Sequence, residues 1–452
     1  MPNPKTLPEN RSSFLIRLAL ETLAIFACCL GWFGWGLASE PHFMDESAYI
    51  SQSFYADLLR EGRWNHPAWL DYAACDLPPL PKYMIGVELW IEGFRRPSLA
   101  DSRTWYKHLD RQFVGLPGLV AARRPSVLVG AIGVVAIFWL GTLAFDHRVG
   151  GLAAFFLAVN PLYRLHARRA MSDVPAECFI ILSLVFGLMA WKRTSLRGPS
   201  LRSVWIIGVA GVMVGLATLS KLNGVLSGLV LASWIAVAMA SKAFTPGSKR
   251  FLVAGTVLAV GVALGTFTAL NPFLTAQLPE PVSPELASGA HMNFPQRIKA
   301  VFDHRAKVSV VAMNTFPNDA LPTLLDRLSV VLVQGFGRFG PMGRQGVADS
   351  TIRFDPRQDW GALLWVPTVS LGLMVLLRRG LDQFRQGVPP LAALIVAYFV
   401  VVDSVVTSFL PLAWDRYMMS IQPPSALIAS MFLVWCFDRL SGRGRVASES
   451  TL

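Results

Sequence analysis

The chain has 452 residues, enough for two or three soluble domains, but 53% of them are hydrophobic, only 15% are charged, and the mean hydropathy is +0.45. A soluble globular chain carries roughly 25% charged residues, so the composition argues against that class. The net charge of +12 lies mainly in short loops between apolar runs, without a basic stripe interleaved with aromatics, which argues against nucleic-acid binding. We predict a polytopic, all-α membrane protein.

Ten apolar runs follow one another along the chain and are expected to form membrane-spanning helices, each near the roughly 20 residues that such a helix needs. They cover about residues 14–37, 125–145, 150–162, 174–191, 204–219, 224–240, 251–270, 360–377, 389–410 and 420–437, and the third of them is short. The basic start of the first run is typical of a signal peptide, but the run exceeds the roughly 7–15 apolar residues of such a peptide. We expect a retained first span and a cytoplasmic N-terminus.

Two long loops interrupt the apolar runs, at residues 39–123 and 272–359. In the first loop, residues 47–61 and 81–94 carry apolar side chains at helical spacing and are too short to span a bilayer. This pattern predicts two helices that lie along the membrane interface. In the second loop, residues 324–336 are apolar but contain charged side chains, so we assign them to the surface.

The charge of the shorter loops indicates which side of the membrane each loop occupies. With ten spans and an inside N-terminus, the short basic loops and the C-terminal tail all fall on the cytoplasmic side, in agreement with the positive-inside rule. Both long loops then face outward, and we expect a plasma-membrane protein with its active site outside. Residues 1–240 form one predicted module, and residues 241–452 form a second.

Two adjacent carboxylates, Asp45 and Glu46, stand where the first span leaves the hydrocarbon. A charge at that depth costs free energy unless a function retains it. A carboxylate beside a partly desolvated cleft can act as a general base or bind a cation. The alternative is structural, because Asp and Ser also favour the N-caps of helices. The pair alone leaves both interpretations open.

Cationic side chains at other outer positions are candidates for binding a phosphate. Lys82 lies in the first turn of a helix opened by prolines, where the helix dipole disfavours a cation, although a lysine there can also snorkel to lipid headgroups. Arg168 and Arg169 lie at the mouth of the third and fourth spans, and arginine matches phosphate geometry through paired donors. Asp173 beside them is a candidate catalytic carboxylate, or it caps the fourth span.

Three further residues at outer span ends, Lys221, Arg416 and Tyr417, are candidates for substrate binding, although such residues are often interface anchors. Asp403 lies well inside the ninth span, where an acid is a functional candidate unless a neighbouring hydroxyl holds it. The histidines show no ligand spacing, so no metal is assigned to them. Whether a divalent cation binds at Asp45 and Glu46 is left open.

Six stretches resemble the GT-C superfamily of membrane glycosyltransferases, in particular the protein O-mannosyltransferases and the aminoarabinose (ArnT-like) lipid A transferases. The stretches are Met44-Asp45-Glu46, Pro78-Pro79-Leu80-Pro81-Lys82, Arg123-Arg124-Pro125-Ser126 through Gly150, Asn160-Pro161-Leu162 with Arg168 and Asp173, Gly215 to Lys221, and Trp414-Asp415-Arg416-Tyr417 with Pro423. The resemblance covers residues 14–240 in order and the end near 410–437. Asp76-Leu77 replaces the family's usual histidine before the second stretch.

The resemblance implies a GT-C-like bundle of about ten spans that moves a hexose or pentose from a polyprenyl-phosphate donor to an extracytoplasmic acceptor, by an inverting displacement. The acceptor would be a glycolipid, a polysaccharide or a protein hydroxyl. Asp45 would serve as catalytic base or orient the acceptor, with Glu46 as a supporting or metal-facing neighbour and Asp173 as a further catalytic carboxylate. The donor phosphate and lipid would contact Lys82, Arg168, Arg169, Lys221, Arg416 and Tyr417. A transporter or lipid flippase is the main alternative, and a non-catalytic subunit with the same fold is another.

Overall fold

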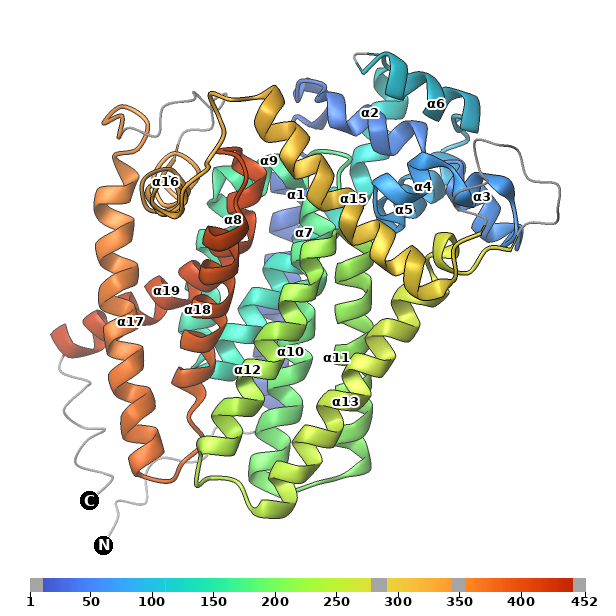
Figure 1. The fold of residues 1–452 in the computed structure, drawn as a ribbon. Coiled ribbons are helices and arrows are strands. Elements are labelled where there is room, and N and C mark those ends of the chain that lie inside the picture. Colours follow the sequence, from blue (N-terminus) through green and yellow to red (C-terminus); the bar gives the residue numbers. More distant parts are fainter. Residues whose placement is uncertain (1–10, 110, 278–290, 344–353, 442–452) are drawn as a thin grey trace, which may run out of the picture.

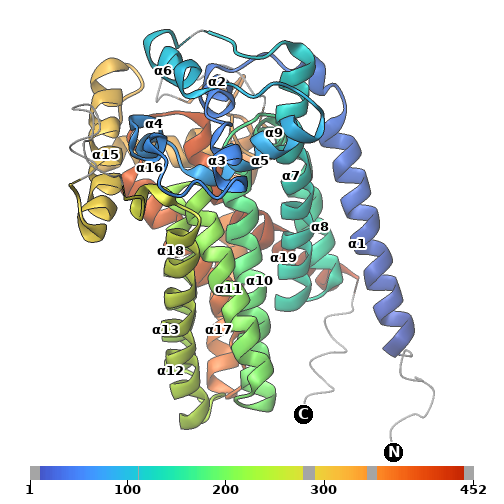
Figure 2. The ribbon, with the colours of Figure 1, turned by 90° about the vertical axis from the view of Figure 1, so that its right-hand side faces the viewer.

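The long helices of the protein form one bundle, drawn as a ribbon in Figures 1 and 2. The structure is a computed structural model and describes residues 11–109, 111–277, 291–343 and 354–441. The long helices in these ranges are α1 (Arg11–Gly34), α7 (Leu116–Ala144), α10 (Asp173–Arg197), α11 (Leu201–Ser220), α12 (Val225–Ala240), α13 (Pro246–Ala269), α17 (Gly361–Arg385), α18 (Leu391–Phe409) and α19 (Gln422–Leu440). Of the described helices, nine are long and apolar enough to span a membrane. The predicted all-α polytopic fold is confirmed.

The third predicted span differs from the others because its helix is short. This helix, α8 (His147–Val159), has 13 residues, so at 1.5 Å per residue it is about 20 Å long, less than the roughly 30 Å of a bilayer core. A second short helix, α9 (Pro161–Ala167), follows at once. Asn160 separates the two, because its side-chain oxygen accepts a hydrogen bond from Tyr163 N at 2.9 Å and caps α9. Two short helices therefore replace the single span expected over residues 150–162.

Helix α7 packs against α1, α8 and α10. Its contact with α8 requires Gly150, because a Cβ at that position would lie 2.4 Å from the carbonyl oxygen of Phe138. Helix α10 packs along α11, and α11 packs along α13. The end of α1, the start of α10, the end of α11 and the start of α19 all lie at the same end of the bundle (Figures 1 and 2).

Shorter helices cover that end of the bundle. They are α2 (Met44–Ser51), α3 (Tyr55–Arg60), α4 (Tyr72–Asp76), α5 (Pro79–Ile91) and α6 (Leu99–Lys107) from the first long loop, and α15 (Phe294–Thr315) and α16 (Leu324–Val330) from the second. The helices expected over residues 47–61 and 81–94 correspond to α2 with α3 and to α5. Helix α5 crosses close to the turn between α2 and α3, because a Cβ at Gly86 would lie 2.3 Å from the Ser53 carbonyl oxygen.

Helix α15 lies in a part of the second long loop where the sequence predicts no helix. Its first turn is capped reciprocally: the Asn293 side chain accepts from Gln296 N at 3.1 Å, and the Gln296 side chain accepts from Asn293 N at 2.8 Å. Arg297 then donates to the carbonyl oxygens of Phe273 and Ala276 at 3.0 and 2.7 Å. These bonds hold α15 against the chain that leaves α13.

The assignment of residues 324–336 to the surface is wrong for the second half of that segment. Leu324 is exposed at the start of α16, and Asp326 closes a capping box there. The chain then continues as a π-helical turn, η5 (Val331–Gly335), which packs against α17, and Phe336 after it is 3% exposed. The charged side chains of the segment belong to its first turns only, so they do not keep the remainder in solvent.

Candidate functional site

Asp45 and Glu46 occupy the first turn of α2. The chain reaches this point from α1 through a short 3-10 helix, η1 (Leu37–Ser39). Acidic side chains in a first turn are favoured by the helix dipole, and Glu46 also accepts a hydrogen bond from Phe43 N at 3.0 Å. Local interactions therefore place both carboxylates at the covered end of the bundle.

Glu46 is enclosed in a buried network and has no free oxygen. Both oxygens contact the guanidinium of Arg123 on α7, at 2.8 and 2.7 Å, and both partners are 0% exposed. The backbone amide of Ala170 donates a further bond to Oε1 at 2.9 Å. Four hydrogen bonds thus saturate this carboxylate, and its position favours a role in holding α2 rather than contact with a substrate or a metal.

Asp45 points to a different partner, Arg416, which comes from the other end of the sequence. Arg416 lies in a 3-10 helix, η6 (Asp415–Ile421), and its guanidinium donates to the Asp45 carboxylate. The two side chains are 28% and 23% exposed. Arg416 also lies 4.9 Å from the ring centre of Trp414. Unlike Glu46, Asp45 is therefore accessible and has one charged partner.

A second ion pair lies beside the first. Lys221, directly after α11, donates to the Asp173 carboxylate at the start of α10 at 2.7 Å. The Asp173 side chain is 2% exposed, while Lys221 is 24% exposed. Tyr417 joins the two pairs, because its ring centre lies 5.7 Å from Lys221 Nζ and 5.6 Å from the Arg416 guanidinium. These five residues, Asp45, Asp173, Lys221, Arg416 and Tyr417, form what we call the charged cluster.

His166 lies behind the charged cluster, between two carboxylates. Its Nδ1 is 3.7 Å from Asp173 and its Nε2 is 3.7 Å from Asp415, and the ring is 1% exposed. Both distances are too long for hydrogen bonds, and neither ring nitrogen has a hydrogen-bond partner among the described residues. His166 stands alone in the sequence without ligand spacing, so no local pattern marks this position.

Glu177 is a second residue that the sequence analysis did not single out. It lies one turn after Asp173 on α10, is 1% exposed, and accepts a hydrogen bond from Ser420. Ser420 in turn accepts from the side-chain amide of Asn223 at 3.4 Å. The spacing of four residues places Glu177 and Asp173 on one helix face, and an acid inside an apolar run is a recognisable signal. The polar surroundings of the charged cluster therefore extend into the bundle.

Arg168 and Arg169 lie at the edge of the charged cluster and do not form part of it. Arg168 lies 3.1 Å from the Glu40 carboxylate and also donates to the Gly36 carbonyl, which fixes the end of α1. Arg169 lies 4.0 Å from Glu40 and 4.4 Å from the ring centre of Phe43. Their side chains are only 10% and 14% exposed, and their contacts hold the chain between α1 and α2.

Lys82 lies apart from the charged cluster, inside the folded first loop. It is 1% exposed, donates to the Ala73 carbonyl at 2.7 Å, and lies 4.9 Å from the ring centre of Tyr55. Burial lowers the pKa of Lys82 from 10.5 to about 7, and Asp76 offsets part of this change. This geometry gives no support to the expected phosphate contact, because the ammonium group is enclosed and already bonded.

Asp76 connects the two long loops. Its carboxylate lies 3.0 Å from His304 Nε2 on α15, accepts from the Tyr106 hydroxyl at 2.7 Å, and lies 3.6 Å from the Arg305 guanidinium. Burial acts to raise the pKa of Asp76, but the bond to His304 and the charge of Arg305 outweigh it and hold this pKa below 3.8. Asp76 thus anchors α15 to α4.

The second loop also supports the turn that carries Arg416. Ala320 and Leu412 form an isolated antiparallel bridge, and Leu321 N donates to Pro411 O at 3.0 Å. The indole nitrogen of Trp414 donates to Asp319 at 3.1 Å. These bonds fix the entry to η6 and thereby the position of the Arg416 guanidinium.

Within the described part of the chain, no three His, Cys, Asp or Glu side chains are grouped so that they could hold a metal ion. The candidate carboxylates Asp45 and Asp173 each face a cation of the protein instead. Asp403 is half-buried on α18. It has no hydrogen-bond or ion-pair partner among the described residues, so it does not belong to the charged cluster.

Comparison with known proteins identifies the fold. Residues 113–267 match the family model described as dolichyl-phosphate-mannose-protein mannosyltransferase. The apo oligosaccharyltransferase of Archaeoglobus fulgidus is similar in structure over 95% of this chain, with a TM-score of 0.57 and 14% identity. A structure of the same enzyme, AglB, with an inhibitory peptide and a dolichol-phosphate covers 95% of this chain with a TM-score of 0.55 and 12% identity.

This chain spans only about half of those archaeal chains, 52% in both structures. The Pmt1-Pmt2 protein O-mannosyltransferase complex of S. cerevisiae, bound to its sugar donor, aligns with 59% of this chain and 34% of its own, at 16% identity and a TM-score of 0.45. No curated protein matches the sequence. The chain therefore has the membrane fold of the GT-C glycosyltransferases, as its motifs predicted, and residues 113–267 are similar to the dolichyl-phosphate-mannose-protein mannosyltransferases.

Proposed function

We propose that this protein is a membrane glycosyltransferase that moves one sugar from a polyprenyl-phosphate donor to a hydroxyl acceptor outside the cytoplasm. The observation that carries the proposal is the contact of Asp45 with Arg416, next to the Lys221–Asp173 pair, at the covered end of a GT-C bundle. An accessible carboxylate beside two cations offers a base for an acceptor and a binding site for a phosphate. The dolichol-phosphate bound by AglB supports the same donor class.

The proposed reaction is a single inverting displacement. The acceptor oxygen forms a bond to the anomeric carbon while the bond from that carbon to the phosphate oxygen breaks. Asp45 takes the proton of the acceptor hydroxyl, and the bonding electrons leave with the polyprenyl phosphate. Arg416 and Lys221 stabilise the charge that develops on the departing phosphate oxygens, as preorganised donors do in enzyme sites. Tyr417 keeps the two cations apart at fixed distances from its ring.

Asp173 positions Lys221 in this scheme. Its side chain is almost fully buried and is bonded to the Lys221 ammonium, so it cannot itself reach a large acceptor. His166 approaches Asp173 from the other side at 3.7 Å. We infer that Asp173 fixes the direction of Lys221, and that His166 limits the movement of Asp173.

The orientation in the membrane follows from the distribution of basic residues. The connections at the end opposite to the charged cluster are short, and they and the adjoining helix ends are rich in Lys and Arg, for example around the turn from α10 to α11 and around the turn from α12 to α13. The positive-inside rule places those loops in the cytoplasm. We propose that both termini are cytoplasmic and that the charged cluster opens outward, where a glycolipid, a polysaccharide or a protein hydroxyl would arrive.

Transfer from a labelled polyprenyl-phosphate sugar by the purified protein tests the proposal. Removing a general base lowers rates by about 10²–10⁴-fold, so we expect a loss of this size for Asp45→Asn. Asp403→Asn is the matched control, because Asp403 is a half-buried acid outside the charged cluster, and it should transfer at the wild-type rate. Equal transfer by wild type and Asp45→Asn would refute the catalytic assignment, and donor movement without transfer would favour a flippase.

A further inference from the structure

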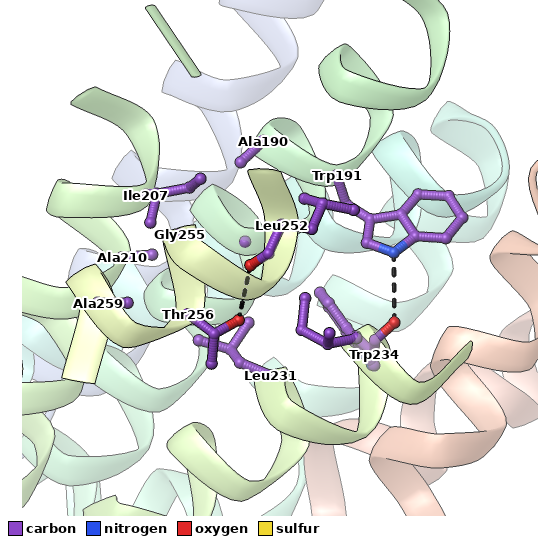
Figure 3. A pocket seen from close by; sticks show the side chains of 12 residues that line it. Ala190, Trp191, Ile207, Ala210, Leu231, Trp234, Leu252, Gly255, Thr256 and Ala259 are labelled. Carbon is purple, nitrogen blue, oxygen red and sulfur yellow. Dashed lines mark hydrogen bonds between the residues drawn. The ribbon is translucent and has the colours of Figure 1, made fainter. Parts of the chain in front are cut away.

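An apolar cavity lies between α10, α11, α12 and α13, and Figure 3 shows the side chains that line it. It lies toward the end of the bundle opposite to the charged cluster, because its lining comes from the last part of α10 and the first part of α11. Its volume is about 50 Å³. Helices α10 and α11 contribute small side chains such as Ala190 and Ala210, and α13 contributes Ala259. Thr256 is the polar side chain at the wall, and its hydroxyl is already bonded to the Leu252 carbonyl at 3.0 Å. An apolar cavity of this kind does not hold water.

The cavity opens toward the surroundings of the bundle instead of being sealed inside it. Leu231, Ile235, Thr256 and Ala259 line it and are only half-buried. Trp234 forms a rigid part of the wall, because its indole nitrogen donates to the Leu394 carbonyl at 2.8 Å. All four helices are long and apolar enough to span a membrane, so the medium at the opening is hydrocarbon and the group that enters is an acyl chain.

Cations surround the same end of these four helices. They are Lys192, Arg193 and Arg197 at the end of α10, Arg202 at the start of α11, Lys242 after α12, and Lys249 and Arg250 at the start of α13. No Asp or Glu occurs in the sequence between Glu177 and Glu280, so no carboxylate of these helices or their connections neutralises them. Lys249 lies in the first turn of α13, where the helix dipole favours an anion, and Arg250 follows it directly.

We propose that this cavity and its cationic rim bind a phospholipid with an anionic headgroup. A short segment of one acyl chain would enter the cavity from the half-buried side, and the phosphate would lie at the rim near Lys249 and Arg250. Basic pockets between spanning helices are suited to such headgroups, and charge complementarity selects an anionic lipid over a zwitterionic one. The proposal is independent of the sugar transfer, because the charged cluster lies at the other end of the bundle.

The binding is measured by the Tm of the detergent-solubilised full chain, with phosphatidylglycerol or phosphatidylcholine added in increasing amounts. A ligand that binds the folded state raises Tm with its concentration, and we expect this for phosphatidylglycerol alone. Ala259→Leu fills the cavity from its half-buried edge and should abolish the shift. Ala254→Leu is its matched control, since Ala254 is exposed on the same helix, and should keep the shift.

The headgroup contact is tested by Arg250→Gln, with Arg385→Gln at the end of α17 as the control outside this site. Loss of one cation near an anionic lipid weakens binding about fivefold, so Arg250→Gln should need about five times more lipid for the same shift. Native mass spectrometry of the wild-type complex gives a second measurement that needs no variant. Equal shifts with both lipids, or an undiminished shift in Ala259→Leu, would overturn the proposal.

Discussion

Replacing Glu46 by glutamine separates the roles of the two adjacent carboxylates. Arg123 donates to both Glu46 oxygens and to the carbonyl oxygens of Leu37, Glu40 and Pro41, at 2.7 to 3.0 Å, without exposure to solvent. Glutamine leaves this guanidinium buried without its counter-charge. Removing one partner of a buried ion pair lowers the free energy of unfolding by roughly 3–5 kcal/mol. At about 2 °C per kcal/mol for a large chain, Tm should fall by up to roughly 10 °C.

Replacing Asp45 by asparagine should have the opposite effect, with little change in Tm and a loss of sugar transfer. The Asp45–Arg416 pair is 28% and 23% exposed, and pairs that reach solvent contribute only about 0–1 kcal/mol. Asp45→Asn should therefore change Tm by no more than about 2 °C while it removes sugar transfer. Tm in detergent and transfer activity are measured on the same preparations. Arg123→Met is measured alone and combined with Glu46→Gln, which tests whether the losses of stability caused by the two substitutions are coupled.

The assignment of separate roles fails if Glu46→Gln leaves Tm unchanged, because a buried and fully bonded carboxylate cannot be neutralised without loss. It also fails if Asp45→Asn lowers Tm as much as Glu46→Gln does. In either case the structural role of the second carboxylate and the catalytic role of the first would have to be abandoned together.

Three further substitutions test other parts of the site. Lys221→Gln should lower transfer at least about 10-fold, the effect of losing one charge-assisted contact of about 1.5–3 kcal/mol, whereas Lys299→Gln, an exposed ion-pair residue on α15, should not. Lys82 has a pKa of about 7 when folded and 10.5 when unfolded, so the unfolded chain binds more protons between these values. Wild-type stability should therefore rise with pH from 7 to 10 relative to Lys82→Met, as Tm measurements would show. Because the pKa of Asp76 is lowered, its contribution is present above pH 3.8 and lost as pH falls. Asp76→Asn should release α15 from α4 and increase protease cleavage within residues 291–315.

The apolar runs determine most of the bundle, because a helix of about 20 apolar residues has few alternatives in a bilayer. The exceptions have local causes. Helix α8 ends at Val159, before the end of the apolar run expected over residues 150–162, since Asn160 and Pro161 end it and start the next helix. Helix α15 was missed although its start, Asn293 with Gln296, carries a capping-box pattern, because the surrounding prolines and charges are typical of a loop.

The site was predictable in its location and less so in its contacts. The order of spans places Asp45, Asp173, Lys221 and Arg416 at one end, and the structure brings these four together. Their pairing depends on the approach of segments as far apart as 371 residues in sequence, which no local pattern encodes. Lys82 lies in the same long loop as Asp45 but points into the core of that loop, where it donates to the Ala73 carbonyl of α4. No local pattern around Lys82 encodes this direction.

The pairing of Asp45 with Arg416 suggests why donor binding precedes proton transfer in the proposed reaction. Asp45, Asp173 and Asp415 carry three negative charges against the two positive charges of Lys221 and Arg416. A donor phosphate adds further negative charge and competes with Asp45 for the Arg416 guanidinium. The Asp45 carboxylate, no longer held by Arg416, would then be free to accept the proton of an acceptor hydroxyl. Without donor, the ion pair would keep Asp45 turned toward Arg416 and away from an acceptor.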